Sequence, residues 1–246
     1  MRRFAFLLIL FAALAAPPAR ADEPSDTQLL DAFYVAALGS SSGRPGDEPR
    51  LVRWTVPVRI GLMGLEAGEA TLGVLREQIE RLRVITGHDL QQVRDGGANV
   101  VVMFAEDPFA DVEKEPYRGQ LLPLFQRDPA MPGLIALARG SAPCFAFTLR
   151  GNNERPAASL VGLSTRSGPA EMRTCIVKLL PKVLGLGGLT DAFWSVTAAG
   201  FRHADLPNGD VRMLKLLYSP KLTQGMTLSE VKRLAPTVLK ELPAAN

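Results

Sequence analysis

The stretch ANVVVMFAE, residues 98–106, is an almost uninterrupted apolar run. A strand with one face in water alternates apolar and polar residues, so this run predicts a strand that is covered on both faces. The segment 51–64 alternates instead, with Val56, Val58 and Ile60 on one side, and predicts a second strand.

Two amphipathic segments predict helices. In 66–87 the apolar residues recur at helical spacing, and Gly87 stands where a helix is usually ended. The segment 168–186 has a similar apolar stripe. Residues 107–142 are rich in proline and glycine and predict a long irregular excursion. The remaining expected elements are a helix at 25–38, a linker at 39–50, a short strand at 88–95, strands at 144–151 and 157–165, a loop region from 187, a helix at 210–218 capped by Asp210, and a last helix opened by a capping box of Thr227 and Glu230. The order of these elements therefore predicts an α+β chain.

The first residues have the pattern of a secretory signal peptide, residues 1–21. A basic start precedes an apolar run at 4–16, which is too short to span a bilayer, and Ala19 and Ala21 form a cleavage site. No cysteine stands directly after the apolar run, so we expect no bacterial lipid anchor. No later segment is long and apolar enough to span a membrane, so we expect an exported chain, periplasmic or secreted. After cleavage, residues 22–50 would form a helix and linker, and residues 51–246 a single domain.

The net charge of the exported chain indicates which class of partner it can bind. Three of the 28 Lys and Arg residues lie in the signal peptide, whereas all 25 Asp and Glu residues follow it. The exported chain would therefore be close to neutral, which argues against a nucleic-acid partner because such proteins need a basic face. Two cysteines, Cys144 and Cys175, remain after export. In an oxidising compartment such a pair predicts one disulfide, with two buried free thiols as the alternative.

Several segments together resemble the zincin metallopeptidase fold, above all its metzincin branch. They are RWTVPVRI, TGHDL, ANVVVMF, the LGL that ends the segment 174–186, and DVRMLKLLYSP. From about residue 53 to 236 the chain more closely resembles an uncharacterised family of exported proteobacterial proteins, domain of unknown function 2927, itself similar to the zincins. The similar positions are 57–60, 86–87, 98–100, 143–145, Cys175, 184–186, 216–218 and 225–226. The resemblance implies a zincin-like mixed sheet with two main helices and a C-terminal helical part.

The chain departs from the zincins where their chemistry lies. Counted back from LGL, the two ligand histidines would fall at Lys178 and Lys182, and the catalytic glutamate at Leu179. Zinc catalysis needs three protein ligands and a base that takes a proton from the bound water, and leucine cannot serve as that base. The two lysines, four residues apart on one face, are expected to be solvated, with a clamp for a substrate as the alternative. Pro181 lies between them and is expected to kink a helix. We therefore expect no catalytic residue, no cofactor and no stoichiometric zinc.

A metal site could also be built from residues elsewhere in the chain. His88 and His203 are the only histidines, and Asp205 lies near the second of them. Two histidines and a carboxylate could hold a metal ion, so these three residues are the alternative metal set. Asp191 and Asp210 are more typical of helix caps.

The first functional hypothesis is a non-catalytic zincin-like protein that binds or scaffolds a peptide or protein partner in the cell envelope. The expected site is a cleft between strand 144–151, with Phe145, Phe147 and Leu149, and helix 174–186. An edge strand at that place could pair with an extended peptide through backbone hydrogen bonds. The second hypothesis is a hydrolase with an atypical metal site, acting on peptide or cell-wall material.

Overall fold

The computed structural model describes residues 23–38, 48–64, 67–94, 96–139, 143–151 and 155–243. The expected signal peptide and most of the expected linker at 39–50 lie outside the described residues. Within the described part, no helix is long and apolar enough to cross a membrane.

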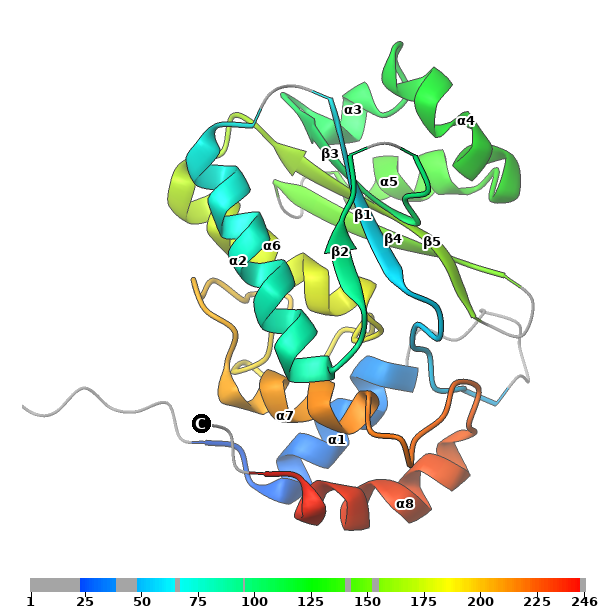
Figure 1. Cartoon of the computed structure of the whole chain (residues 1–246), viewed down its shortest axis with the longest axis vertical. Helices are drawn as coiled ribbons and strands as arrows, with labels where there is room; N and C mark the ends of the chain where they lie inside the picture. Colours follow the sequence, from blue (N-terminus) through cyan, green and yellow to red (C-terminus); the bar gives the residue numbers. More distant parts are fainter. Residues whose placement is uncertain are drawn as a thin grey trace, which may run out of the picture.

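One mixed sheet of five strands, in the order β2-β1-β3-β5-β4, forms the middle of the molecule (Figure 1). β2, β1, β3 and β5 are parallel neighbours, and β4 pairs antiparallel with β5. The bounds are β1 Val58–Gly64, β2 Leu90–Gln92, β3 Val100–Ala105, β4 Cys144–Arg150 and β5 Pro156–Ser164. β4 is therefore the terminal strand at one edge of the sheet.

The two faces of the sheet carry two separate apolar cores. Helices α2, Glu69–Thr86, and α6, Pro169–Val183, pack together over one face, and α3, Pro108–Asp111, α4, Tyr117–Arg127, and α5, Met131–Ala138, lie over the other (Figure 1). β3 contributes Val100, Val102 and Phe104 to the first core and Met103 and Ala105 to the second. The apolar run 98–106 is thus a strand covered on both faces, as its sequence predicts.

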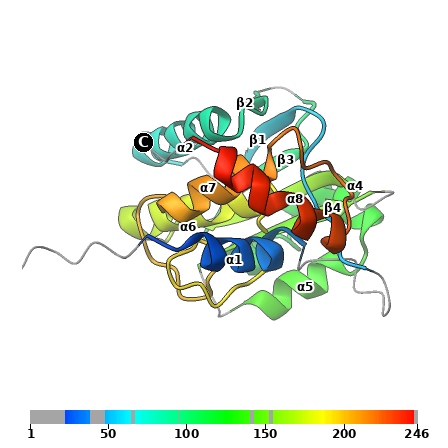
Figure 2. The same ribbon diagram turned by 90° about the horizontal axis from the view of Figure 1, so that it is seen from below.

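A third group of helices closes one end of the molecule. α1, Asp26–Leu38, α7, Asn208–Leu217, and α8, Leu228–Glu241, contact one another there (Figure 2). The predicted capping box at the start of α8 is confirmed, because Thr227 and Glu230 each bond the other's backbone N–H. The predicted left-handed end of α2 at Gly87 is also confirmed, with φ of 63°. The chain is a mixed α+β protein.

Three expectations about these elements were wrong. Residues 107–142 contain α3, α4 and α5 rather than an irregular excursion. The strand expected at 51–64 begins only at Val58, because the preceding residues bond helix ends and loops instead: Leu51 N–H donates to Met226 O and Val52 N–H to Ala37 O. Asp210 does not cap α7, whose N-cap is Pro207.

Candidate functional site

A cleft of about 370 Å³ lies where β4 faces the C-terminal end of α6. Its lining is Val52, Ala146, Phe147, Thr148, Arg150, Lys182, Val183, Gly185 and Gly187. One wall is therefore the edge strand of the sheet, and the other is the last turn of a helix and the glycine-rich segment after it. This is the place at which the sequence predicts a cleft.

The predicted disulfide is present and ties the two walls together. Cys144 opens β4 and Cys175 lies in α6, with 6.1 Å between their Cα atoms. Both cysteines are buried in the first core. The covalent link limits how far the strand and the helix can separate at that end.

The LGL segment is a helix end of the Schellman type. The N–H of Leu186 donates to the carbonyl of Pro181, and the N–H of Gly185 donates to that of Lys182. Gly185 has φ of 121°, and a Cβ there would lie 2.2 Å from the carbonyl oxygen of Val52. Only glycine fits this position, because the backbone conformation and the close approach both exclude a side chain.

Two buried aromatic side chains bond further carbonyls at this helix end. Trp54 Nε1 donates to the carbonyl of Val183 at 2.8 Å, and Tyr218 Oη donates to that of Leu184 at 2.9 Å. Burial raises the pKa of Tyr218 well above its usual 10.0, so the hydroxyl keeps its proton. The segments RWTVP, LGL and LLY are thus brought together here, and their hydrogen bonds fix one wall of the cleft.

Only one of the three expected cleft residues of β4 lines the cleft. Phe147 is part of the lining, but its side chain packs against the second core and the Phe145 ring, and Phe145 and Leu149 are buried in that core on the other face of the sheet. Side chains alternate along a strand, so Ala146, Thr148 and Arg150 point to the cleft side. Apolar residues occupy both faces of β4, so the sequence pattern does not show which face meets α6.

The three residues that the sequence resemblance would place at zincin motif positions differ in their burial. Leu179 is buried in the first core. Lys178 and Lys182 are half-buried, so the expectation that both are solvated was wrong. Burial, and then the charge of Arg202, lower the pKa of Lys178, whose Nζ donates to the carbonyl of Ala199 at 3.1 Å.

Lys182 is the more perturbed of the two lysines. Burial and, second, the charge of Lys178 lower its pKa from 10.5 to about 8. Pro181 lies inside α6, directly before Lys182. A sequence pattern with lysines on an otherwise apolar helix end gives no signal of this burial, because the cleft that contains Lys182 is also lined by Val52 and by residues of β4, which are distant in the chain.

The alternative metal residues have other contacts. His88 Nε2 lies 2.9 Å from the carbonyl of Val56, and its ring packs on Tyr218. The His203 ring packs on Phe201, and Asp205 pairs with Arg173 at 3.1 Å. Among the described residues, no group of three His, Cys, Asp or Glu side chains is placed to hold a metal ion.

Sequence reasoning missed a buried polar network at the start of α7. Ser195 Oγ donates to Asp210 Oδ1 at 2.6 Å, and the N–H of Val196 donates to Oδ2 at 2.9 Å. Thr197 Oγ1 lies 2.7 Å from both Ser195 Oγ and Thr190 Oγ1. Burial raises the pKa of Asp210 from 3.8 to about 7, although both hydrogen bonds act in the opposite direction. The network fastens the loop 190–198 to α7.

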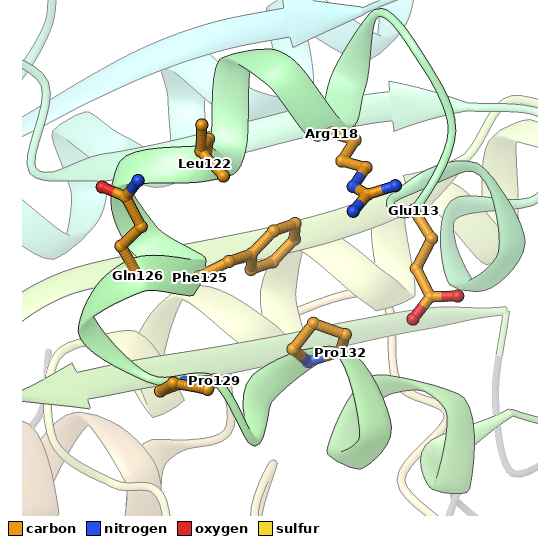
Figure 3. A pocket seen from close by; sticks show the side chains of 7 residues that line it. All are labelled: Glu113, Arg118, Leu122, Phe125, Gln126, Pro129 and Pro132. Carbon is orange, nitrogen blue, oxygen red and sulfur yellow. The ribbon is translucent and has the colours of Figure 1, made fainter.

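A second hollow, of about 590 Å³, lies between α4 and α5. Phe125 points into it, and Arg118 and Glu113 lie together at one end (Figure 3). Its lining residues all come from 113–132, and none of them belongs to a strand. The cleft beside β4 differs because it combines strand backbone with cationic side chains.

A family profile described as a protein of unknown function, DUF2927, matches residues 26–237. A search of curated proteins finds no match. The matched region contains both walls of the cleft, the disulfide and the network around Asp210.

Proposed function

The chain belongs to the DUF2927 family of proteins of unknown function, and we propose that it acts by binding an extended peptide segment of a cell-envelope partner along β4. The partner segment adds to the sheet as a further strand, and the cleft receives some of its side chains. The protein works as an exported, non-catalytic, zincin-like binding module.

The terminal position of β4 is the observation that carries this proposal. A strand at the edge of a sheet presents alternate N–H and C=O groups that the sheet does not pair. Addition of a strand to such an edge is a recurring mode of peptide recognition, in which backbone bonds give affinity and pockets for alternate side chains give specificity. The cleft runs beside β4 from Ala146 to Arg150 and could receive those side chains.

The rigidity of both walls supports binding. The disulfide holds β4 to α6, and the Schellman end, Trp54 and Tyr218 fix the last turn of that helix. A site whose groups are already in place loses less conformational entropy when a ligand binds.

The residues at the absent zincin motif support a role other than peptide hydrolysis. Leu179 has no proton acceptor and packs in the core, so it cannot take a proton from an attacking water. No observation among the described residues favours the alternative of a hydrolase with an atypical metal site.

A displayed library of random twelve-residue peptides tests the proposal. We expect the purified chain to enrich peptides, and N-methylation of their backbone amides to weaken binding at every second position. Bound peptide should slow hydrogen exchange of β4 amides and leave those of β2, the opposite edge strand, unchanged. Failure to enrich any peptide, or equal tolerance of N-methylation at all positions, would refute strand addition.

Export is a separate part of the proposal with its own measurement. Sequencing the N-terminus of the chain recovered from the periplasm should give Asp22 as its first residue. Recovery of a chain that still contains residues 4–16 would count against export by a cleaved signal peptide.

A further inference from the structure

We propose that the peptide segment bound along β4 carries an acidic side chain, and that its carboxylate pairs with Lys182 inside the cleft. This inference rests on the proposed function and specifies its ligand. The carboxylate belongs to an internal aspartate or glutamate of the segment.

Lys182 is placed where a ligand in the cleft can reach it. It stands in the last turn of α6 and lines the cleft opposite β4, and Arg150 lines the cleft from the end of that strand. Among the described residues, no hydrogen bond or ion pair engages the ammonium of Lys182. A half-buried charge that lacks a protein partner is available to a ligand.

The charged side chains near Lys182 favour a negatively charged ligand. The charge that acts on Lys182 is that of Lys178, and the charge that acts on Lys178 is that of Arg202. No carboxylate contributes to the pKa shift of either lysine. Among the described lining residues of the cleft, the charged side chains are those of Lys182 and Arg150, and no carboxylate is present, so a ligand carboxylate would meet positive charge there.

The burial of the charged Lys182 side chain has a cost in folding free energy. A lowered lysine pKa means that the fold disfavours the charged form, so Lys182 weakens the folded state at neutral pH. An apolar side chain of similar length would pack at this helix end without that penalty. Residues that reduce stability in a cleft are typical of binding sites.

The cleft also indicates which carboxylate is bound. Residues from Ala146 to Arg150 line the same cleft as Lys182, so a strand that pairs with β4 runs along this cleft. A chain end would place its carboxylate beyond the last backbone pair. An acidic side chain within the strand reaches into the cleft from a paired position.

The peptides enriched from the library give the test. We expect an aspartate or glutamate at a fixed offset from the positions that are sensitive to N-methylation. Changing that residue to its amide should lower affinity about tenfold for the unchanged chain and less than about twofold for Lys182→Met.

Three further variants separate charge from structure. Lys182→Arg keeps the charge and should retain the preference for the acid. Lys240→Met removes an exposed lysine on α8 and should behave as the unchanged chain. Lys182→Met should itself be folded, with a melting temperature at least equal to that of the unchanged chain, because it removes the buried charge.

The outcomes distinguish this inference from the function on which it rests. If peptides bind with alternating N-methyl sensitivity but without acidic residues, the inference falls and the proposed function stands. An acid-to-amide effect that is equally large in Lys182→Met also overturns it, as does a preference that disappears when only the peptide C-terminus is amidated. If no peptide binds at all, both fall.

Discussion

Asp210 and Lys182 show how burial, rather than residue type, sets the chemistry of single positions in this chain. Burial moves the pKa of Asp210 up to about 7 and that of Lys182 down to about 8, so both can change charge within two pH units of neutrality. In the sequence, Asp210 has the features of a helix cap and Lys182 those of a solvated lysine. Neither burial is visible in the local sequence pattern, because burial depends on the packing of segments that are distant in the chain.

Asp210 predicts a specific pH dependence of stability. Its pKa is higher in the folded than in the unfolded chain, so its contribution is fully present below about pH 4 and is lost as the pH rises through about 7. Asp210→Asn removes this titration, and its amide can accept from the N–H of Val196 and donate to Ser195 Oγ. Between pH 5 and 8 we expect the unchanged chain to lose on the order of 2–3 kcal/mol of unfolding free energy relative to the variant.

Urea unfolding at pH 5 and pH 8 measures that difference. Asp191→Asn, an exposed change in the same loop, is the matched control and should follow the profile of the unchanged chain. Parallel profiles for Asp210→Asn and the unchanged chain would show that Asp210 stays charged in the fold.

Gly185 is a residue whose role is fixed by backbone geometry. A Cβ at this position would meet the carbonyl of Val52 at 2.2 Å in addition to the positive φ, so Gly185→Ala should destabilise by about 2–4 kcal/mol. Gly225 has φ of 85° but no heavy atom within 4 Å of a Cβ, so Gly225→Ala should cost about 1 kcal/mol. Gly200→Ala, with open space and no positive φ, should change stability by less than about 0.5 kcal/mol. Equal effects in the three variants would contradict the close approach of residues 52 and 185.

At the scale of elements, local signals predicted those helices and strands whose ends and periodicity lie within one segment. The stripe of α2 with Gly87, the capping box of α8 and the apolar run of β3 are of this kind. Helices α4 and α5 give no clear local signal, because their prolines and glycines and their weak periodicity are typical of irregular segments. Pro132 stands instead in the first turn of α5, where its missing N–H is not needed, and Pro123 lies inside α4.

The pairing of β4 with α6 can be tested through its disulfide. The bond closes a loop of 31 residues, and by restricting the unfolded chain it should contribute about 3–4 kcal/mol to stability. Reduction should lower the urea midpoint of the unchanged chain and leave that of the double variant Cys144→Ala, Cys175→Ala unaffected. Detection of two free thiols by mass spectrometry of unreduced protein would contradict the pairing.

At the scale of the whole molecule, the sequence predicted a mixed α+β chain and a cleft between two segments, but not the order of the strands. β5 lies between β3 and β4 although it follows both in the chain. That order puts β4 at the edge of the sheet and next to α6. It depends on long-range packing of two cores, which no local pattern reports.

The metal content of the whole chain separates the two functional hypotheses. Lys178 and Lys182 stand where the resemblance to zincins would place ligand histidines, and a lysine ammonium has no free lone pair for a cation until it loses its proton. His88 contacts the carbonyl of Val56, the His203 ring packs on Phe201, and Asp205 pairs with Arg173. We therefore expect far less than one zinc per chain when the protein is purified without a chelator and without a polyhistidine tag, measured by elemental analysis. About one zinc per chain, lost in His88→Ala or His203→Ala but kept in the control Lys240→Met, would instead favour the hydrolase, because such a metal could lower the pKa of a bound water to about 7 and supply a hydroxide.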